Sequence, residues 1–366
     1  MTDAVADFSG PSVRHLASQR RWRISIVTGC ILLGLVCVSL GSLTSGAVRM
    51  PASQVFQTLM DAAFGRGAAA NAQDALIVMQ IRLPRLVLGL LVGAALAVSG
   101  ALMQGLFRNP LADPGLVGVS SGAGLAAAAT IVLGHRLLGD TITKLPFAAL
   151  PAGAFVGGLA TTIILYVIAT RRGRTSIATM LLGGVAIGAL AGSLTGLLAY
   201  ASDDTQLRDL TFWSLGALTG ATWSKIAVIA PILLPILVAV PMLARGLNGL
   251  MMGEAEAYHL GISVQRIKRA TILLVALATG ASVAAAGVIG FVGIVVPHML
   301  RLVVGSDHRV LLPLCGLAGA ALLCGADIVA RTVVAPAELP IGIVTAAIGA
   351  PFFLWLLLRQ TGRPIT

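Results

Sequence analysis

The chain has 366 residues, of which 57% are hydrophobic and 11% are charged, and its mean hydropathy is +0.95. Apolar runs long enough to cross a bilayer core of about 30 Å as helices recur along it, so the composition excludes a soluble globular protein. The net charge of +11 does not indicate a nucleic-acid partner, because basic residues of membrane proteins gather in cytoplasmic loops and hold the topology.

Ten apolar segments predict an all-α, multi-pass membrane protein. In chain order they cover about residues 24–46, 84–107, 114–134, 145–169, 177–200, 225–244, 270–290, 293–304, 309–330 and 339–358. The eighth is too short for a full crossing, so we expect a half-helix buried among its neighbours. The first is too long for the apolar core of a cleaved signal peptide, which favours a retained span. The predicted organisation is a cytoplasmic tail over 1–23, one transmembrane domain over 24–360 and a C-terminal tail over 361–366.

The distribution of basic residues predicts the topology. With the N-terminus inside, 16 of the 25 lysines and arginines fall on the inner side and 9 on the outer side, so both termini are expected to be cytoplasmic. Arg82 and Arg85, which flank Pro84 before the second segment, and Arg331, after the ninth, then lie outside. Arginines at the outer side oppose the usual charge rule and need a separate reason.

The sequence carries neither a nucleotide-binding motif nor an evident ion site. Asp327, near the outer end of the ninth segment, is the clearest ionisable residue within a span, whereas proton- and sodium-coupled carriers usually keep several. Unwound backbone can also bind sodium, so an ion-coupled secondary transporter stays an alternative. No catalytic motif is present, and the GxGxxA match at residues 122–127 lies in a predicted membrane helix without a preceding strand. The four cysteines lack metal-site spacing and are expected to be small buried apolar residues.

The longest inner loop between spans, residues 245–269, is a candidate contact for an energy-supplying partner. We expect one helix from Leu250 to Leu260, a break at Gly261, and a second helix capped by Ser263. Such an element would form a rigid projection suited to a groove on another protein, or an amphipathic connector lying on the lipid surface. Spacing alone does not choose between them.

A row of glycines marks one face of the fifth segment. Gly184, Gly188, Gly192 and Gly196 recur every four residues, which places them near one face of a helix. Such a face can pack tightly against a neighbouring helix, line a wide path or form the seam of a dimer. The spacing is compatible with all three.

Four stretches together identify a family resemblance. They are IRLPRLVLGLLVGAALAVSGALMQGLFRNPLADPGLVGVSSGAG, GVIGFVGIVVPHMLRLVVGSDHRVLLP, ADIVAR and ELPIGIVTAAIGAPFFLWLL. From about residue 50 to 360 the chain resembles the permease subunit of the iron-chelate, haem and vitamin B12 ABC importers, which are type II importers. The resemblance implies a homodimer of ten-helix subunits in the bacterial inner membrane. Two ATPase subunits would bind inside, a periplasmic binding protein would dock outside, and ATP with Mg²⁺ would sit on the ATPases, leaving this subunit without a cofactor.

The resemblance also implies roles for particular residues. External arginines of the family pair with glutamates of the binding protein, and the matching positions are Arg82, Arg85 and Arg331; snorkelling to lipid headgroups is the alternative. The loop that contacts the ATPase is matched by Gly253, Glu254, Ala257, Leu260 and Gly261. Because the fifth helix lines the path in relatives, the row of Gly184, Gly188, Gly192 and Gly196 is interpreted as a pathway wall or dimer seam.

The P-H-x-x-R motif formed by Pro297, His298 and Arg301 is shared across the family and does not indicate a metal site. Pro297 removes a helix hydrogen bond, so we expect the motif to shape the broken eighth segment. The expected function is import of haem or another iron chelate by alternating access, driven by a partner ATPase. A cobalamin importer of the same family is the alternative, and a secondary transporter or a passive channel are alternatives from other classes.

Overall fold

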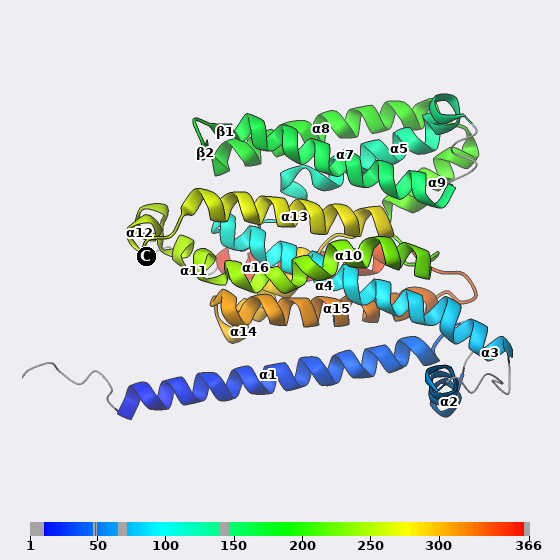
Figure 1. Ribbon diagram of the computed structural model, residues 1–366, viewed down its shortest axis with the longest axis horizontal. Coiled ribbons are helices and arrows are strands. Elements are labelled where there is room, and N and C mark those ends of the chain that lie inside the picture. The colour runs from blue at the N-terminus through cyan, green and yellow to red at the C-terminus, as the bar shows by residue number, and fades with distance from the viewer. Residues whose placement is uncertain (1–10, 47, 49, 65–71, 140–145, 362–366) are drawn as a thin grey trace, which may run out of the picture.

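The computed structural model describes residues 11–46, 48, 50–64, 72–139 and 146–361. Its helices lie side by side in a bundle, with α1 along one edge, α8 along the opposite edge and α4 between them (Figure 1). Each of the ten predicted segments overlaps an apolar helix, which confirms the all-helical, multi-pass class.

The bounds of the elements follow, with η1 a π-helical turn and η2 and η3 3₁₀ turns. They are α1 Pro11–Thr44, α2 Ala52–Ala63, α3 Ala72–Leu76, η1 Ile77–Arg82, α4 Leu83–Phe107, η2 Pro114–Val117, α5 Val119–Leu138, α7 Pro146–Ala169, β1 Thr170–Arg171, β2 Arg174–Thr175, α8 Ile177–Tyr200, α9 Asp204–Ser214, α10 Trp223–Ala239, η3 Val240–Leu243, α11 Ala244–Met252, α12 Glu254–His259, α13 Val264–Ala286, α14 Val292–Val304, α15 His308–Thr332 and α16 Ile341–Thr361. Strands β1 and β2 form a small antiparallel hairpin that was not expected from the sequence.

Lengths and compositions match crossing of a bilayer. Within the described residues, 7 helical stretches are long and apolar enough to span it, and three shorter apolar stretches lie in α5, α14 and α16. The first of the long stretches is Ser18–Thr44, so α1 begins well before the predicted boundary at residue 24. The membrane boundaries themselves stay a prediction.

Helix α4 lies at the centre of the bundle because its small residues let other backbones approach closely. A Cβ on Gly100 would collide with the carbonyl oxygen of Gly293 in α14, and a Cβ on Gly93 with that of Gly319 in α15. Lipid supplies no hydrophobic force between helices, so contacts of this kind provide much of the packing free energy. The helix is also continuous with α3 through η1, and the π-helical turn precedes Pro84, which cannot donate a helix hydrogen bond.

The interruption around the eighth segment lies earlier than expected. Helix α13 ends at Ala286, where Gly287 has φ +72°, and α14 begins after Phe291, which has φ +69°. Pro297 lies inside α14, and the helix continues past it to Val304. Pro297 itself therefore does not break the helix. The two residues with positive φ do so, because an α-helix requires negative φ throughout. That the P-H-x-x-R motif shapes this short segment stays a prediction.

The two ends of the bundle differ. Helix α1 begins at the end where α12 lies, whereas α2, α3 and α9 lie at the opposite end (Figure 1). Helix α9, which the sequence analysis did not predict, begins with a capping box in which the Asp203 side chain accepts from the backbone N–H of Gln206, and the Gln206 side chain accepts from the backbone N–H of Asp203.

Candidate functional site

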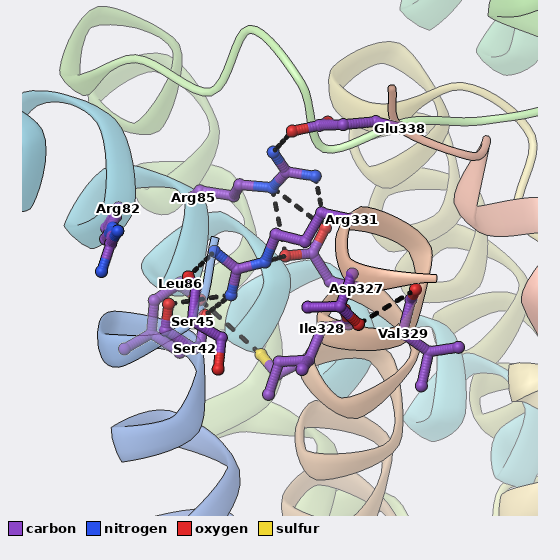
Figure 2. A network of polar contacts seen from close by, with 12 residues as sticks. Ser42, Ser45, Arg82, Arg85, Leu86, Asp327, Ile328, Val329, Arg331 and Glu338 are labelled. Atoms are coloured by element: carbon purple, nitrogen blue, oxygen red, sulfur yellow. Dashed lines mark hydrogen bonds and ion pairs between the residues drawn. The ribbon is translucent and has the colours of Figure 1, made fainter. Parts of the chain in front are cut away.

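A buried carboxylate, Asp327 of α15, organises the end of the bundle opposite α12. The Arg85 guanidinium donates to it from Nη2 at 2.8 Å and from Nε at 3.0 and 3.1 Å. Arg331, one turn later in α15, forms an ion pair with it at 3.4 Å between Nε and Oδ2. Figure 2 shows Asp327 between the two arginines, with Glu338 beyond Arg85 at 2.9 Å from its Nη1. One carboxylate thus joins α4 to α15.

At the same end of the bundle, arginine side chains bind the carbonyl oxygens at the end of α1. Arg331 donates from Nη2 to the carbonyl oxygen and the hydroxyl of Ser42, each at 2.8 Å, and from Nη1 to the carbonyl oxygen of Ser45 at 3.0 Å. Arg82 donates to the carbonyl oxygens of Leu43 and Val48. Because the last carbonyls of a helix have no partner within it, these guanidinium groups satisfy the end of α1 and tie it to α4 and α15.

The cluster is buried and its charges do not cancel. Arg82, Arg85 and Arg331 are 4%, 9% and 6% exposed and Asp327 is 2% exposed. The Glu338 side chain is 35% exposed, so it forms the part of the cluster that faces solvent. Three guanidinium groups face two carboxylates, which leaves an excess of one positive charge at this end.

The structure differs from the sequence-based expectation of arginines that project toward a partner. All three lie at the end opposite α12, but their side chains are buried. They donate hydrogen bonds within the chain, to Asp327 or to carbonyl oxygens at the end of α1. Docking by Arg82, Arg85 and Arg331 therefore stays a prediction. The four-residue spacing of Asp327 and Arg331 is visible in the sequence and could have indicated their pairing, whereas Arg85 is 242 residues from Asp327.

The loop at the other end folds into two helices where one was expected. The predicted helix over Leu250–Leu260 is interrupted at Gly253, whose φ of +128° ends α11 and precedes α12. The predicted break at Gly261 is present, with φ +77°. Ser263 occupies the position before α13, but its side chain makes no capping hydrogen bond, which corrects the expectation that it caps the helix.

Two contacts fix α12 to the bundle. Glu254 forms an ion pair at 2.7 Å with Lys268 of α13, whose side chain is buried and also donates to the carbonyl oxygen of Thr175 in β2 at 3.1 Å. Ala257, on the inner side of α12, is fully buried and packs near Gly249 of α11. The short helix is therefore held in place although it has fewer than two turns.

The outer side of this element exposes large apolar side chains. Met252, Tyr258 and Leu260 are 65%, 74% and 62% exposed. Of the five residues predicted to contact an ATPase, Leu260 is exposed, Glu254 is bound to Lys268, and Gly253, Ala257 and Gly261 shape the fold of the loop. Exposed apolar groups at a polar end of the molecule are typical of a protein-binding surface, and Tyr258 and Met252 extend the predicted set.

The glycine row of α8 divides into two halves. A Cβ on Gly184 would collide with the backbone of Leu116, and one on Gly188 would lie 3.4 Å from the hydroxyl of Ser121. Gly192 and Gly196 have nothing within 4 Å, and they lie among exposed side chains of α8. Tight packing within the chain thus explains Gly184, while Gly192 and Gly196 are left facing outward.

The P-H-x-x-R motif is buried without metal-site geometry. His298 is 5% exposed, neither ring nitrogen is hydrogen-bonded, and its ring meets Phe352 of α16 edge to face at 6.4 Å between centroids. The Nε and Nη2 atoms of Arg301 are likewise buried without a partner. No group of three or more His, Cys, Asp or Glu side chains in the described ranges could hold a metal ion.

Cys315 and Cys324 are buried as expected, but Cys30 and Cys37 lie on the outward side of α1.

Comparison with known proteins identifies the class. The model of the FecCD transport family matches residues 31–359. The hemin transport system permease HmuU of Yersinia pestis is 46% identical over 92% of this chain and 96% of its own length. The vitamin B12 import permease BtuC of Klebsiella pneumoniae is 46% identical over 81% and 87%. A solved structure of a protein assigned as a metal-chelate type ABC transporter, in an inward-facing conformation, superposes with a TM-score of 0.78 at 31% identity over 92% and 99%.

The described features define a multi-pass membrane permease, a transport subunit and not an enzyme. The chain belongs to the FecCD transport family, the permeases of iron-chelate, haem and vitamin B12 ABC importers. This confirms the family predicted from the sequence.

Removing the central carboxylate tests the buried cluster. We expect Asp327→Asn to destabilise the protein by about 3–5 kcal/mol, because two buried guanidinium groups lose their shared counter-charge. The measurement is thermal unfolding of the purified protein in detergent. The control, Glu338→Gln, removes a carboxylate that is 35% exposed and should cost less than about 1 kcal/mol. Equal unfolding temperatures for Asp327→Asn and the unsubstituted protein would contradict this account.

Proposed function

We propose that this chain forms the homodimeric membrane subunit of an ATP-driven importer that takes haem from a periplasmic binding protein and releases it into the cytoplasm. The observation that carries the cargo assignment is the 46% identity with a hemin permease over 92% of the chain. Vitamin B12 permeases reach the same identity over a smaller share, 81% for one of them, so cobalamin is the second candidate.

The chemistry of the described residues supports passage of an intact chelate. No cluster of metal-ligating side chains is present among them, so the metal would keep the ligands with which it arrives. The outward-facing Gly192 and Gly196 of α8 offer a smooth surface for a path or a seam with a second copy. Alternating access then requires two packings of the dimer, and the chain itself would bind no cofactor.

The exposed side of α12 supports coupling to an ATPase. The element is fixed to α13 by the Glu254–Lys268 ion pair, so a displacement applied to Tyr258 or Leu260 would reach the transmembrane helix through a rigid contact. ATP and Mg²⁺ would bind to the two ATPase subunits at this end. Gly253, Ala257 and Gly261 are proposed to set the shape that the ATPase recognises.

Truncating the exposed apolar side chains of α12 tests this contact. We expect Tyr258→Ala with Leu260→Ala to weaken binding of the ATPase at least about tenfold, because the two side chains together would lose burial worth more than about 1.4 kcal/mol. The measurement is the dissociation constant of the ATPase from the permease in nanodiscs. Val333→Ala, which trims an apolar side chain 66% exposed at the opposite end, should leave binding unchanged. Wild-type affinity in the double variant would contradict the proposal.

Docking of the binding protein is proposed at the end that carries Arg82, Arg85 and Arg331. Arg82 and Arg331 are engaged by carbonyl oxygens of α1, which leaves Arg85 as the arginine nearest to solvent through its contact with Glu338. A carboxylate of the binding protein would replace Glu338 on Nη1 of Arg85, since a hydrogen bond between a guanidinium group and a carboxylate is strengthened by both charges. The excess positive charge of the cluster would favour the encounter.

Neutralising Glu338 tests the exchange. Glu338→Gln removes the internal competitor and adds to the positive charge, so the binding protein should dock about threefold more tightly, with a steeper dependence on salt. The measurement is the dissociation constant at low and high ionic strength in nanodiscs. Glu256→Gln, at the opposite end, is the matched control and should change neither quantity. Unchanged or weaker docking of Glu338→Gln would exclude the exchange.

Reconstitution tests the function as a whole. With its ATPase and binding protein in proteoliposomes, we expect ATP-dependent uptake of haem that excess cobalamin does not inhibit. Uptake of cobalamin instead would identify a vitamin B12 importer. Uptake driven by an ion gradient without the ATPase would identify a secondary transporter, and flux independent of nucleotide would identify a channel.

A further inference from the structure

A cavity of about 660 Å³ opens between α1 and the last turn of α14. It lies at the end of the bundle where α12 lies, because α14 leads directly to Asp307, which accepts a hydrogen bond from Asn248 of α11 at 2.7 Å. Twelve residues line it, all from the stretches 19–27 and 301–305. Neither the permease path nor the proposed ATPase contact uses this cavity.

The lining is basic. Three arginines, Arg20, Arg23 and Arg301, contribute to it, and no acidic side chain does so among the described residues. The Nε and Nη2 atoms of Arg301 are buried and have no hydrogen-bond partner. A buried guanidinium without a partner is unfavourable, so an anionic group within the cavity would stabilise the site.

One acidic residue lies near the cavity without lining it. Arg20 forms an ion pair with Asp307 at 3.4 Å, between side chains that are 56% and 29% exposed. Burial by itself would raise the pKa of Asp307, but the hydrogen bonds from Asn248 and from the backbone N–H of Arg309, together with nearby positive charge, lower it, so this carboxylate is ionised. An exposed pair of this kind is weak, and a single carboxylate leaves the three arginines with an excess of positive charge.

Apart from Gln19, the remaining lining has no polar side chain, and part of it lies on the surface of the chain. Ile26, Leu302 and Val303 line the cavity and are exposed on the surface of the chain, and Trp22 is 71% exposed beside them. The most apolar stretch of α1 has no buried residue. Tryptophan next to arginines is typical of the headgroup level of a membrane, with acyl chains on the apolar side.

We propose that this cavity binds an anionic phospholipid of the cytoplasmic leaflet. The phosphate and headgroup would lie against Arg20, Arg23 and Arg301, and the acyl chains along Ile26, Leu302 and Val303. Basic pockets between transmembrane helices on the cytoplasmic side are suited to anionic headgroups, and guanidinium groups bind phosphate oxygens through paired hydrogen bonds. The bound lipid joins α1 to α14 beside the helices that carry α12.

Native mass spectrometry of the full chain tests the site. The protein in detergent is supplied with equal amounts of phosphatidylglycerol and phosphatidylethanolamine, which carry the same phosphodiester but differ in net charge. We expect the unsubstituted protein to retain phosphatidylglycerol preferentially. Each arginine removed should lower this preference about fivefold, first in Arg23→Gln and then in the double variant Arg20→Gln with Arg23→Gln. Arg23 makes no hydrogen bond or ion pair within the described part of the chain, so the single variant removes no such contact.

The matched control is Arg21→Gln, which removes an exposed arginine between the other two that does not line the cavity. It should keep the full preference. Equal retention of the two lipids by the unsubstituted protein would overturn the proposal, as would an equal loss of preference in Arg21→Gln, which would indicate diffuse surface charge. Displacement of phosphatidylglycerol by millimolar inorganic phosphate would overturn it too, by showing that the site takes a free anion.

Discussion

The arrangement of this permease depends on a single carboxylate buried among arginines. Asp327 holds Arg85 and Arg331 within 3.4 Å, and Arg331 reaches on to the end of α1. Three helices that are distant in sequence are thereby joined at one level of the membrane. Because an unpaired charge in a medium of low dielectric constant is strongly unfavourable, the helices cannot separate at this end without exposing or pairing each guanidinium group anew. The same charges leave an excess of positive charge at this end of the bundle, where docking of a binding protein is proposed.

The opposite end is built on a different principle. There the chain exposes apolar side chains on a short helix that is fixed by one ion pair and by close backbone packing. A firmly fixed projection transmits displacement, whereas a flexible loop would absorb it. Between the two ends, small residues on α4 bring helices together at backbone distance, so a shift of one helix must move its neighbours. Such rigidity is what the proposed coupling between an ATPase and the transmembrane helices would require.

Helix α1 lies along one edge of the bundle. Its C-terminal end is bound through Ser42, Leu43 and Ser45 to the arginine cluster, while a basic cavity opens between its N-terminal half and α14. A membrane protein can use lipid where protein contacts are missing, because headgroup and acyl chain together match a surface that is basic at one level and apolar at the next. The bilayer is then one of the components that hold the structure together.

Hydropathy and charge in the sequence determined the class, the ten helices and the family, since each of these depends on local composition or on contiguous motifs. The glycine break at Gly261 was also local and therefore readable. The tertiary structure alone decided that Arg82, Arg85 and Arg331 are buried, because their partners lie between 34 and 289 residues away, apart from Asp327, which is four residues before Arg331. It also decided that the helix is interrupted at Gly253, which adopts a φ of +128° between α11 and α12. Pairings between distant segments arise from packing, which no local pattern records.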